Sequence, residues 1–191
     1  MPKSPRIILI SGLKRSGKDY VASELAKHLD CDIIAFADPI KTILANTLQM
    51  SVQVFDEYKN SDTELVILHE DGDLSNVCSF RELIQNFSTD AMKPMFGDDV
   101  WSQRMLDSIE NSSKEYIIIP DLRYDAEFED IADHWGNSMF TINVQNRNIQ
   151  NTDTHCSENG LRDFEYDFVI DNTNHDIENP IKYLINKFKA L

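Results

Sequence analysis

A segment near the start of the sequence has the residue types and spacing that proteins use to hold phosphate groups. It reads Gly12-Leu13-Lys14-Arg15-Ser16-Gly17-Lys18-Asp19, a Gly-x-x-x-x-Gly-Lys pattern that follows four aliphatic residues. Glycines let the backbone curl so that successive N–H groups point inward, and a helix start adds partial positive charge. Lys18 would reach the outer phosphates. The segment therefore predicts a nucleotide-binding loop, against the alternative of an ordinary strand–helix turn.

Asp19 departs from the usual form of this pattern. The last position commonly holds Ser or Thr, whose hydroxyl group is a Mg²⁺ ligand, whereas this chain has a carboxylate. Such a carboxylate can bind Mg²⁺ directly, bind it through water, or cap the helix. The sequence leaves these three roles open.

Polar residues also follow two later aliphatic segments. Asp121 and Arg123 come after Tyr116–Ile119, and Arg147 follows the next such segment. Ligands of open α/β sheets bind beyond the carboxyl ends of the strands. Asp121 is thus expected to hold Mg²⁺ directly or through water. Arg123 and Arg147 are expected where charge accumulates on a transferring phosphoryl group.

Two predicted helices carry further candidates. Asp38 precedes Pro39, a pairing that fits a helix cap at least as well as a ligand contact, and Lys41 lies one turn later. Arg81 begins a polar stripe that continues to Gln85 and then to the run Ser88-Thr89-Asp90. This stripe could grip a phosphate at one end and a base or sugar at the other. By pattern alone, Trp101 fits a core position better than a substrate contact.

Short apolar runs alternate with helical periods along the chain. We expect strands at 7–11, 33–37, 116–120, 139–144 and 168–170, with amphipathic helices between them. This order predicts a single three-layer α/β domain, 1–191, with a mainly parallel five-stranded sheet. Residues 51–79, with Glu70-Asp71-Gly72-Asp73 between two apolar segments, predict an inserted hairpin. Residues 145–160 predict a polar lid, or merely a solvated connection.

Composition limits the function classes. The 191 residues contain 18 Lys and Arg against 33 Asp and Glu, a net charge of −15. A protein that coats nucleic acid or an anionic membrane needs a positive field, so we expect neither partner. The three cysteines are far apart, which favours reduced thiols over a disulfide framework. No stretch is apolar enough for a signal peptide or a membrane span, so we expect a soluble cytoplasmic protein.

Taken together, the ordered motifs resemble those of the bacteriophage deoxynucleoside monophosphate kinases, a branch of the P-loop nucleotide kinases. The resemblance is carried by 11–19, by Ala-Asp-Pro-Ile-Lys at 37–41, by Pro-Asp-Leu-Arg at 120–123, and by Asp-Thr-His-Cys-Ser-Glu at 153–158. Arg81 with Thr89-Asp90, Trp101 and Glu127 complete the set. It implies transfer of the ATP γ-phosphoryl group to a deoxynucleoside 5′-monophosphate for DNA synthesis, in the host cytoplasm if the chain comes from a phage.

The resemblance also implies a set of site residues. Lys18, Asp121, Arg123 and Arg147 would be catalytic, and Asp19 and Asp121 would hold Mg²⁺. The ATP-binding residues would be Gly12, Lys14, Arg15, Ser16, Gly17, Lys18 and Asp19. The monophosphate would contact Asp38, Lys41, Arg81, Ser88, Thr89, Asp90, Trp101, Asp121, Arg123, Glu127 and His155.

Two departures concern the substrate. Ser88 stands where this family commonly has Gly, which would narrow the base or sugar pocket, and the insertion is short. The preferred base, the exclusion of ribonucleotides and a homodimeric state stay open. Another small-molecule P-loop kinase, acting on dephospho-coenzyme A or phosphomevalonate, would keep the same ATP half. A non-catalytic ATP-binding regulator is a further alternative, whereas a GTPase would need an Asn-Lys-x-Asp segment that the sequence lacks.

Overall fold

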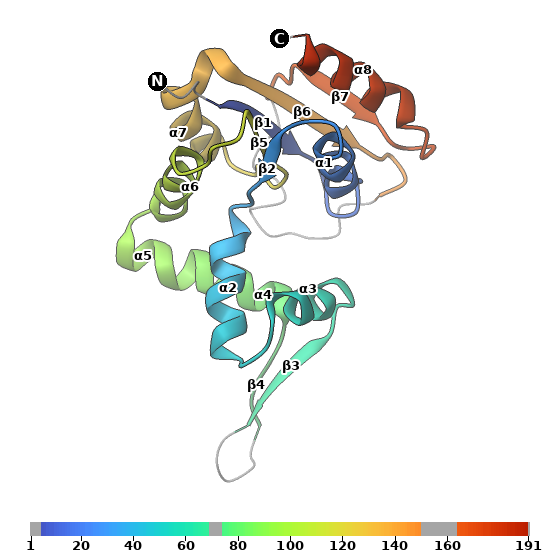
Figure 1. Ribbon diagram of the computed structural model, residues 1–191. Helices are drawn as coiled ribbons and strands as arrows, with labels where there is room; N and C mark the ends of the chain where they lie inside the picture. Colours follow the sequence, from blue (N-terminus) through green and yellow to red (C-terminus); the bar gives the residue numbers. More distant parts are fainter. Residues whose placement is uncertain (1–4, 69–73, 150–163, 191) are drawn as a thin grey trace. The chain divides into compact units, whose positions relative to one another are not determined.

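The structure is a computed structural model that describes residues 5–68, 74–149 and 164–190 (Figure 1). The chain forms two compact units. The first consists of Met1–Phe36 and Ser102–Leu191, and the second of Ala37–Trp101. The predicted insertion, 51–79, lies inside the second unit, which begins earlier in the sequence and ends later.

A five-stranded parallel sheet forms the centre of the first unit. Its strands are β1 (Arg6–Ser11), β2 (Cys31–Ile33), β5 (Tyr116–Ile119), β6 (Met139–Gln145) and β7 (Phe168–Asp171), in the order β2-β5-β1-β6-β7. In the register, Ile8 of β1 lies opposite Ile118 of β5 and Phe140 of β6. β1 and β5 are almost wholly buried, as parallel strands covered on both faces must be. The predicted α/β fold with a mainly parallel five-stranded sheet is confirmed.

Helices cover both faces of this sheet (Figure 1). They are α1 (Lys18–Ala26), α6 (Val100–Glu110), α7 (Asp125–Trp135) and α8 (Glu178–Lys189), with a short 3₁₀ turn, η2 (Gly136–Ser138), after α7. Ile8 and Ile10 belong to one buried cluster with Val21 of α1 and Leu184 of α8. The alternate residues Ile7 and Leu9 point to the opposite face and are also fully buried.

The prediction of a strand at 33–37 is wrong in its bounds. β2 covers Cys31–Ile33 and pairs with β5 only that far. The Ile34 amide still donates to the Ile118 carbonyl at 3.0 Å, but the Phe36 amide donates to the Asp121 side chain instead. The chain then enters α2 at Ala37. A side chain at the end of β5 thus ends the strand that the apolar pattern alone would extend.

The second unit contains a hairpin and several short helices. Its elements are α2 (Ala37–Thr47), α3 (Val52–Asn60), β3 (Glu64–Leu68), β4 (Leu74–Ser79), α4 (Phe80–Gln85), the π-helix η1 (Asn86–Met92) and α5 (Lys93–Phe96). The antiparallel β3–β4 pair confirms the predicted hairpin. Phe55 and Phe80 pack edge to face at 5.0 Å between ring centroids in the core of the unit. A capping box between Ser79 and Glu82 starts α4.

In the described part of the chain, no helix combines the length and the apolar character needed to span a membrane.

Candidate functional site

The loop between β1 and α1 has the backbone shape of a phosphate-binding nest. Arg15 and Gly17 have φ angles of 66° and 102°, on either side of Ser16. Alternation of left- and right-handed residues turns successive N–H groups toward one concave surface. A Cβ atom at Gly12 would lie 2.4 Å from the Val144 carbonyl oxygen, and one at Gly17 would lie 2.4 Å from Asn172 Nδ2. Both positions therefore require glycine, for space as well as for conformation.

The helix that follows the loop presents its N-terminus there. α1 begins at Lys18, which is buried, and its N-cap is Gly17, with no side-chain cap. Asp19 is not the N-cap residue. It is exposed in the first helical turn, where its charge suits the helix dipole. Ser16 Oγ is fully buried and has no hydrogen-bond partner in the described part of the chain. A buried hydroxyl without a partner is costly.

Asn172 is a site residue that the sequence reasoning missed. It follows β7, is buried, and its Nδ2 donates to the Ser16 carbonyl at 2.7 Å. Its own backbone amide donates to the Gln145 carbonyl at the end of β6, also at 2.7 Å. The sequence could have indicated Asn172, because it comes just after the strand predicted at 168–170, as Asp121 comes just after the strand predicted at 116–120.

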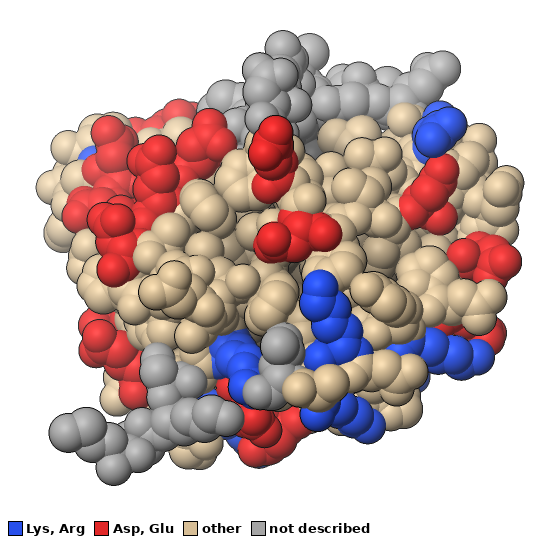
Figure 2. Space-filling view, turned by 90° about the horizontal axis from the view of Figure 1, so that it is seen from above, with Lys and Arg blue, Asp and Glu red and all other residues tan. Residues whose placement is uncertain are grey.

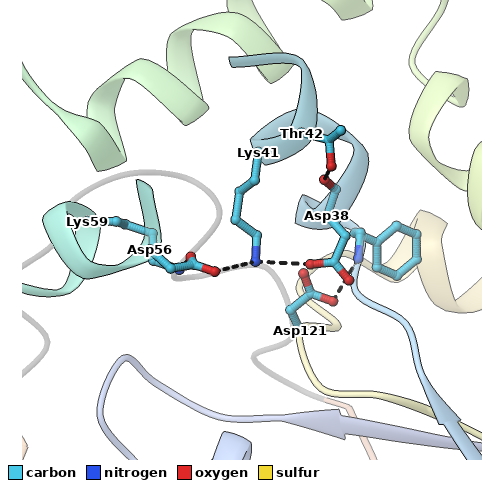
Figure 3. A network of polar contacts seen from close by, with 7 residues as sticks. Asp38, Lys41, Thr42, Asp56, Lys59 and Asp121 are labelled. Carbon is cyan, nitrogen blue, oxygen red and sulfur yellow. Dashed lines mark hydrogen bonds and ion pairs between the residues drawn. The ribbon is translucent and has the colours of Figure 1, made fainter. Parts of the chain in front are cut away.

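The loop after β5 is tied together by Glu127 from the first turn of α7. Glu127 Oε2 accepts hydrogen bonds from the backbone amides of Arg123, at 2.9 Å, and Tyr124, at 3.1 Å. Burial raises the pKa of Glu127 to about 7. The bond from Arg123 opposes this rise, and the nearby charge of Asp121 adds to it. Asp121 Oδ1 in turn accepts from the Phe36 amide at 3.0 Å (Figure 3).

Arg147 follows β6 and lies beside the end of β7. Its guanidinium is 3.3 Å from the Asp171 carboxylate, its backbone amide donates to Thr173 Oγ1 at 3.1 Å, and its side chain is 76% exposed. Hydrogen bonds from Thr173 lower the pKa of Asp171, and the charge of Arg147 lowers it further. Arg147 thus stands at the carboxyl edge of the sheet, where its guanidinium makes a solvent-exposed ion pair with Asp171.

In the second unit, Lys41 lies within a network of paired charges (Figure 3). Its Nζ is 3.0 Å from Asp38 Oδ1 and 3.4 Å from Asp56 Oδ2, and Asp56 also pairs with Lys59 at 2.7 Å. Burial acts to lower the pKa of Lys41, but the bonds and charges of Asp38 and Asp56 outweigh it, so the pKa is raised. The Lys41 side chain is only 12% exposed. An anionic ligand of Lys41 would therefore have to compete with the carboxylates of Asp38 and Asp56.

The remaining candidates of this unit lie on α4, on the π-helix and at Trp101. Arg81 is partly buried, and within the residues described its Nε has no hydrogen-bond partner. Ser88, Thr89 and Asp90 all fall in the π-helix, a geometry frequent at functional sites. Trp101 is buried and donates from Nε1 to the Ser88 carbonyl at 3.1 Å. This bond fixes the position of the Ser88 backbone. Asp90, in the same π-helix, is exposed.

The candidates thus form two sets, one in each unit. The first unit brings the 12–19 loop, Asp121, Arg123 and Arg147 to the carboxyl edge of its sheet, because they follow β1, β5 and β6. The second unit holds Asp38, Lys41, Arg81, Ser88, Thr89, Asp90 and Trp101. His155 and most of the predicted lid lie outside the described residues.

Charge on the surface is unevenly distributed. Asp and Glu side chains gather on the left of the face in Figure 2, on the side where Figure 1 has α7. That helix carries the exposed acidic residues Asp125, Glu129 and Asp133. A polyanionic ligand of this acidic chain must therefore be held by local cations and backbone N–H groups.

Comparison with solved structures shows proteins of similar fold at low sequence identity. A Chloroflexus aurantiacus protein, provisionally assigned as a kinase, is 12% identical with a TM-score of 0.50, and 98% of each chain is covered. The APS kinase of Mycobacterium tuberculosis is 12% identical, with a TM-score of 0.47 and coverage of 98% of this chain and 99% of that one. Shikimate kinase from Bacteroides thetaiotaomicron is also 12% identical, with a TM-score of 0.40 and 97% of each chain covered. No curated protein sequence matches.

A comparison with models of protein families gives a narrower classification of the chain. The model for deoxynucleotide monophosphate kinase matches residues 6–72 and 56–182. The chain belongs to the deoxynucleotide monophosphate kinase family.

Proposed function

We propose that this kinase transfers the γ-phosphoryl group of ATP to a deoxynucleoside 5′-monophosphate and so supplies precursors for DNA synthesis. The bond between the γ-phosphorus and the β,γ-bridging oxygen breaks, and a bond to a phosphate oxygen of the monophosphate forms. The products are ADP and a deoxynucleoside diphosphate. The acceptor oxygen is largely ionised at neutral pH, so the reaction needs alignment and charge neutralisation more than a strong base.

The observation that carries this proposal is the nest at 12–18. Its left-handed residues, the two glycines with no room for a Cβ atom, and the buried Lys18 at the start of α1 all suit a triphosphate. The family match supports a monophosphate as the second substrate.

The other residues have separate roles in this proposal. Arg123 and Arg147 offset charge on the moving phosphoryl group. In the second unit, Lys41 and Arg81 bind the phosphate of the acceptor, and Ser88, Thr89 and Asp90 lie near its sugar or base. Lys41 would exchange one of its carboxylate partners for that phosphate, since both Asp38 and Asp56 now contact it.

The donor set fits Mg²⁺. The described residues contain no group of three His, Cys, Asp or Glu side chains able to enclose a metal ion. Mg²⁺ in kinases needs no such cage, because it keeps several waters and binds one or two carboxylates together with the substrate phosphates. Asp121 and Asp19 would hold it, directly or through water. When bound, the ion neutralises charge on the β- and γ-phosphates.

The test measures ADP release from ATP in the presence of each of the four deoxynucleoside monophosphates and their ribonucleotide counterparts. We expect release that depends on at least one deoxynucleoside monophosphate. Dephospho-coenzyme A and phosphomevalonate complete the panel, because turnover with either alone would contradict the proposal. Release with no acceptor dependence would contradict it too.

Lys18→Ala should lower kcat/KM by a factor of about 100 to 1,000, as the loss of one preorganised donor of about 3–4 kcal/mol implies. The matched control is Lys27→Ala, which removes an exposed lysine of the loop–α1 segment whose partner is Glu24. Near-normal turnover of Lys18→Ala would contradict a role of Lys18 and the nest in the reaction.

A further inference from the structure

We infer that Asn172 is a positioning residue for the phosphate-binding nest, acting through the peptide group between Ser16 and Gly17. The inference rests on the proposed function, since it explains how the nest is held ready for a triphosphate. It concerns residues 156 positions apart in the sequence. Neither the motif nor the family match assigns a role to Asn172.

The Ser16–Gly17 peptide group has a fixed geometry. A trans peptide is planar, and its C=O and N–H bonds point in opposite directions. No cis peptide occurs among the described residues. Asn172 Nδ2 holds the Ser16 carbonyl at 2.7 Å on the side of β7. The Gly17 N–H, which belongs to the same peptide group, is therefore turned away from Asn172.

The backbone around this peptide group has the conformation of a nest. Arg15 and Gly17 are both left-handed, and the Ser16 amide donates to the Leu13 carbonyl at 3.0 Å within the loop. These residues lie in the concave part of the nest, where N–H groups converge. Fixing the Ser16–Gly17 peptide thus fixes the direction of one N–H group that faces an incoming phosphate.

Asn172 is itself held in place by its surroundings. It is 7% exposed, and its backbone amide is bonded to the Gln145 carbonyl, so the strand ends of β6 and β7 hold it. Its amide nitrogen also occupies the space that a Cβ atom at Gly17 would need. Asn172 therefore packs against the nest at Gly17, and it leaves no space there for a residue larger than glycine.

The experiment compares Asn172→Asp and Asn172→Ala with the wild type by calorimetric titration with ATP and Mg²⁺ and by steady-state kinetics. Aspartate keeps the shape of the side chain but removes the donor and places a carboxylate against the Ser16 carbonyl. We expect Asn172→Ala to weaken ATP binding about tenfold and Asn172→Asp by about a hundredfold. The KM for the monophosphate should stay within twofold.

A purely structural role predicts another order. If Asn172 only filled space, alanine would be the more harmful change, because it leaves a cavity. Weaker ATP binding in Asn172→Ala than in Asn172→Asp would overturn the inference, as would affinities within twofold of the wild type. The amide resonance of Gly17 is an independent readout, since its shift on ADP binding should be reduced in both variants.

The matched control is Thr141→Val. Thr141 is buried in β6 and exchanges hydrogen bonds with Asp167 at 2.9 Å, so the variant loses a buried bond between distant segments without touching the loop. It should bind ATP like the wild type. Equal losses of ATP affinity in Thr141→Val and Asn172→Ala would overturn the inference. Lys18→Ala separates the proposed function from this inference. If Lys18→Ala loses activity while both Asn172 variants bind ATP like the wild type, the proposed function stands and the role of Asn172 is contradicted.

Discussion

The two units of this kinase hold their charged and polar groups by different means. In the first, the nest is built from backbone conformation, and Glu127 is bound by N–H groups, with a pKa raised to about 7. In the second, Asp56 is held by the ammonium groups of Lys59 and Lys41. Burial acts to raise its pKa, but these partners lower it overall. Preorganised backbone suits a ligand that is the same in every cycle, whereas paired side chains can exchange partners when a substrate arrives.

The largest expected effect comes from breaking the backbone geometry. Gly17→Ala forces a side chain onto a φ angle of 102° and brings its Cβ to 2.4 Å from Asn172 Nδ2. We expect ATP affinity to fall at least a hundredfold, measured by titration. Gly136→Ala is the control, because a Cβ there meets nothing within 4 Å. Normal ATP binding by Gly17→Ala would show that the nest does not depend on the backbone conformation of Gly17.

The raised pKa of the buried Glu127 in the first unit can be tested through the pH dependence of stability. Its folded pKa of about 7 lies above its usual value of 4.5, so the folded protein binds more protons between these values. This group's contribution to stability is therefore greatest below pH 4.5 and is lost as pH rises to about 7. Glu127→Gln keeps the acceptor for the Arg123 and Tyr124 amides without the charge. We expect it to be more stable than the wild type at pH 8 by on the order of 1–3 kcal/mol, and similar at pH 4.5.

The measurement for Glu127→Gln is thermal unfolding across this pH range, with Glu129→Gln, an exposed change on the same helix, as the control. A parallel pH dependence in the wild type and in Glu127→Gln would contradict the raised pKa.

Asp121→Asn sharpens the role of the carboxylate at the end of β5. The amide oxygen can still accept the Phe36 N–H bond, so the end of β2 should be preserved. We expect the Mg²⁺ concentration at half-maximal activity to rise about tenfold, equivalent to about 1.4 kcal/mol. It is read from a metal titration at fixed ATP. An unchanged titration would assign the metal to Asp19 or to water and phosphate alone.

The smallest effect is expected in the network of the second unit. Asp56→Asn removes the ion pairs to Lys41 and Lys59, which are partly exposed and therefore worth about 1 kcal/mol or less in unfolding free energy. Because the pKa of Asp56 is lowered, its contribution is present above its usual value of 3.8 and is lost as pH falls further. Denaturant unfolding at pH 7 and pH 3 measures both effects.

The same variant tests whether this network can exchange partners. With Asp56 neutral, Lys41 keeps only Asp38 as a charged partner in the network, so the KM for the monophosphate should fall two- to fivefold. The control is Glu57→Gln, a neighbouring exposed carboxylate on α3. A higher KM in Asp56→Asn would mean that Asp56 orients Lys41 for the substrate instead of competing with it.

Local features of this protein were readable from the sequence. The glycine spacing at 12–18 predicted a tightly curled loop before α1, because glycine fits where the backbone is left-handed and a Cβ atom would clash. The short apolar runs predicted β1 and β5, because parallel strands in the middle of a sheet are buried on both faces. Asp121, Arg123 and Arg147 could be placed at one sheet edge by the rule that parallel strands end together.

Only the tertiary structure decided how these pieces are held. The bond from Asn172 to Ser16, the end of β2 at Ile33, the burial of Glu127 and the π-helix at Asn86–Met92 all depend on contacts between segments. Neighbouring residues fix steric preference and periodicity, so a local pattern carries that information by itself. Hydrogen bonds and pKa shifts depend on which atoms meet after the strands have paired and water has been excluded, and no local pattern contains those distances.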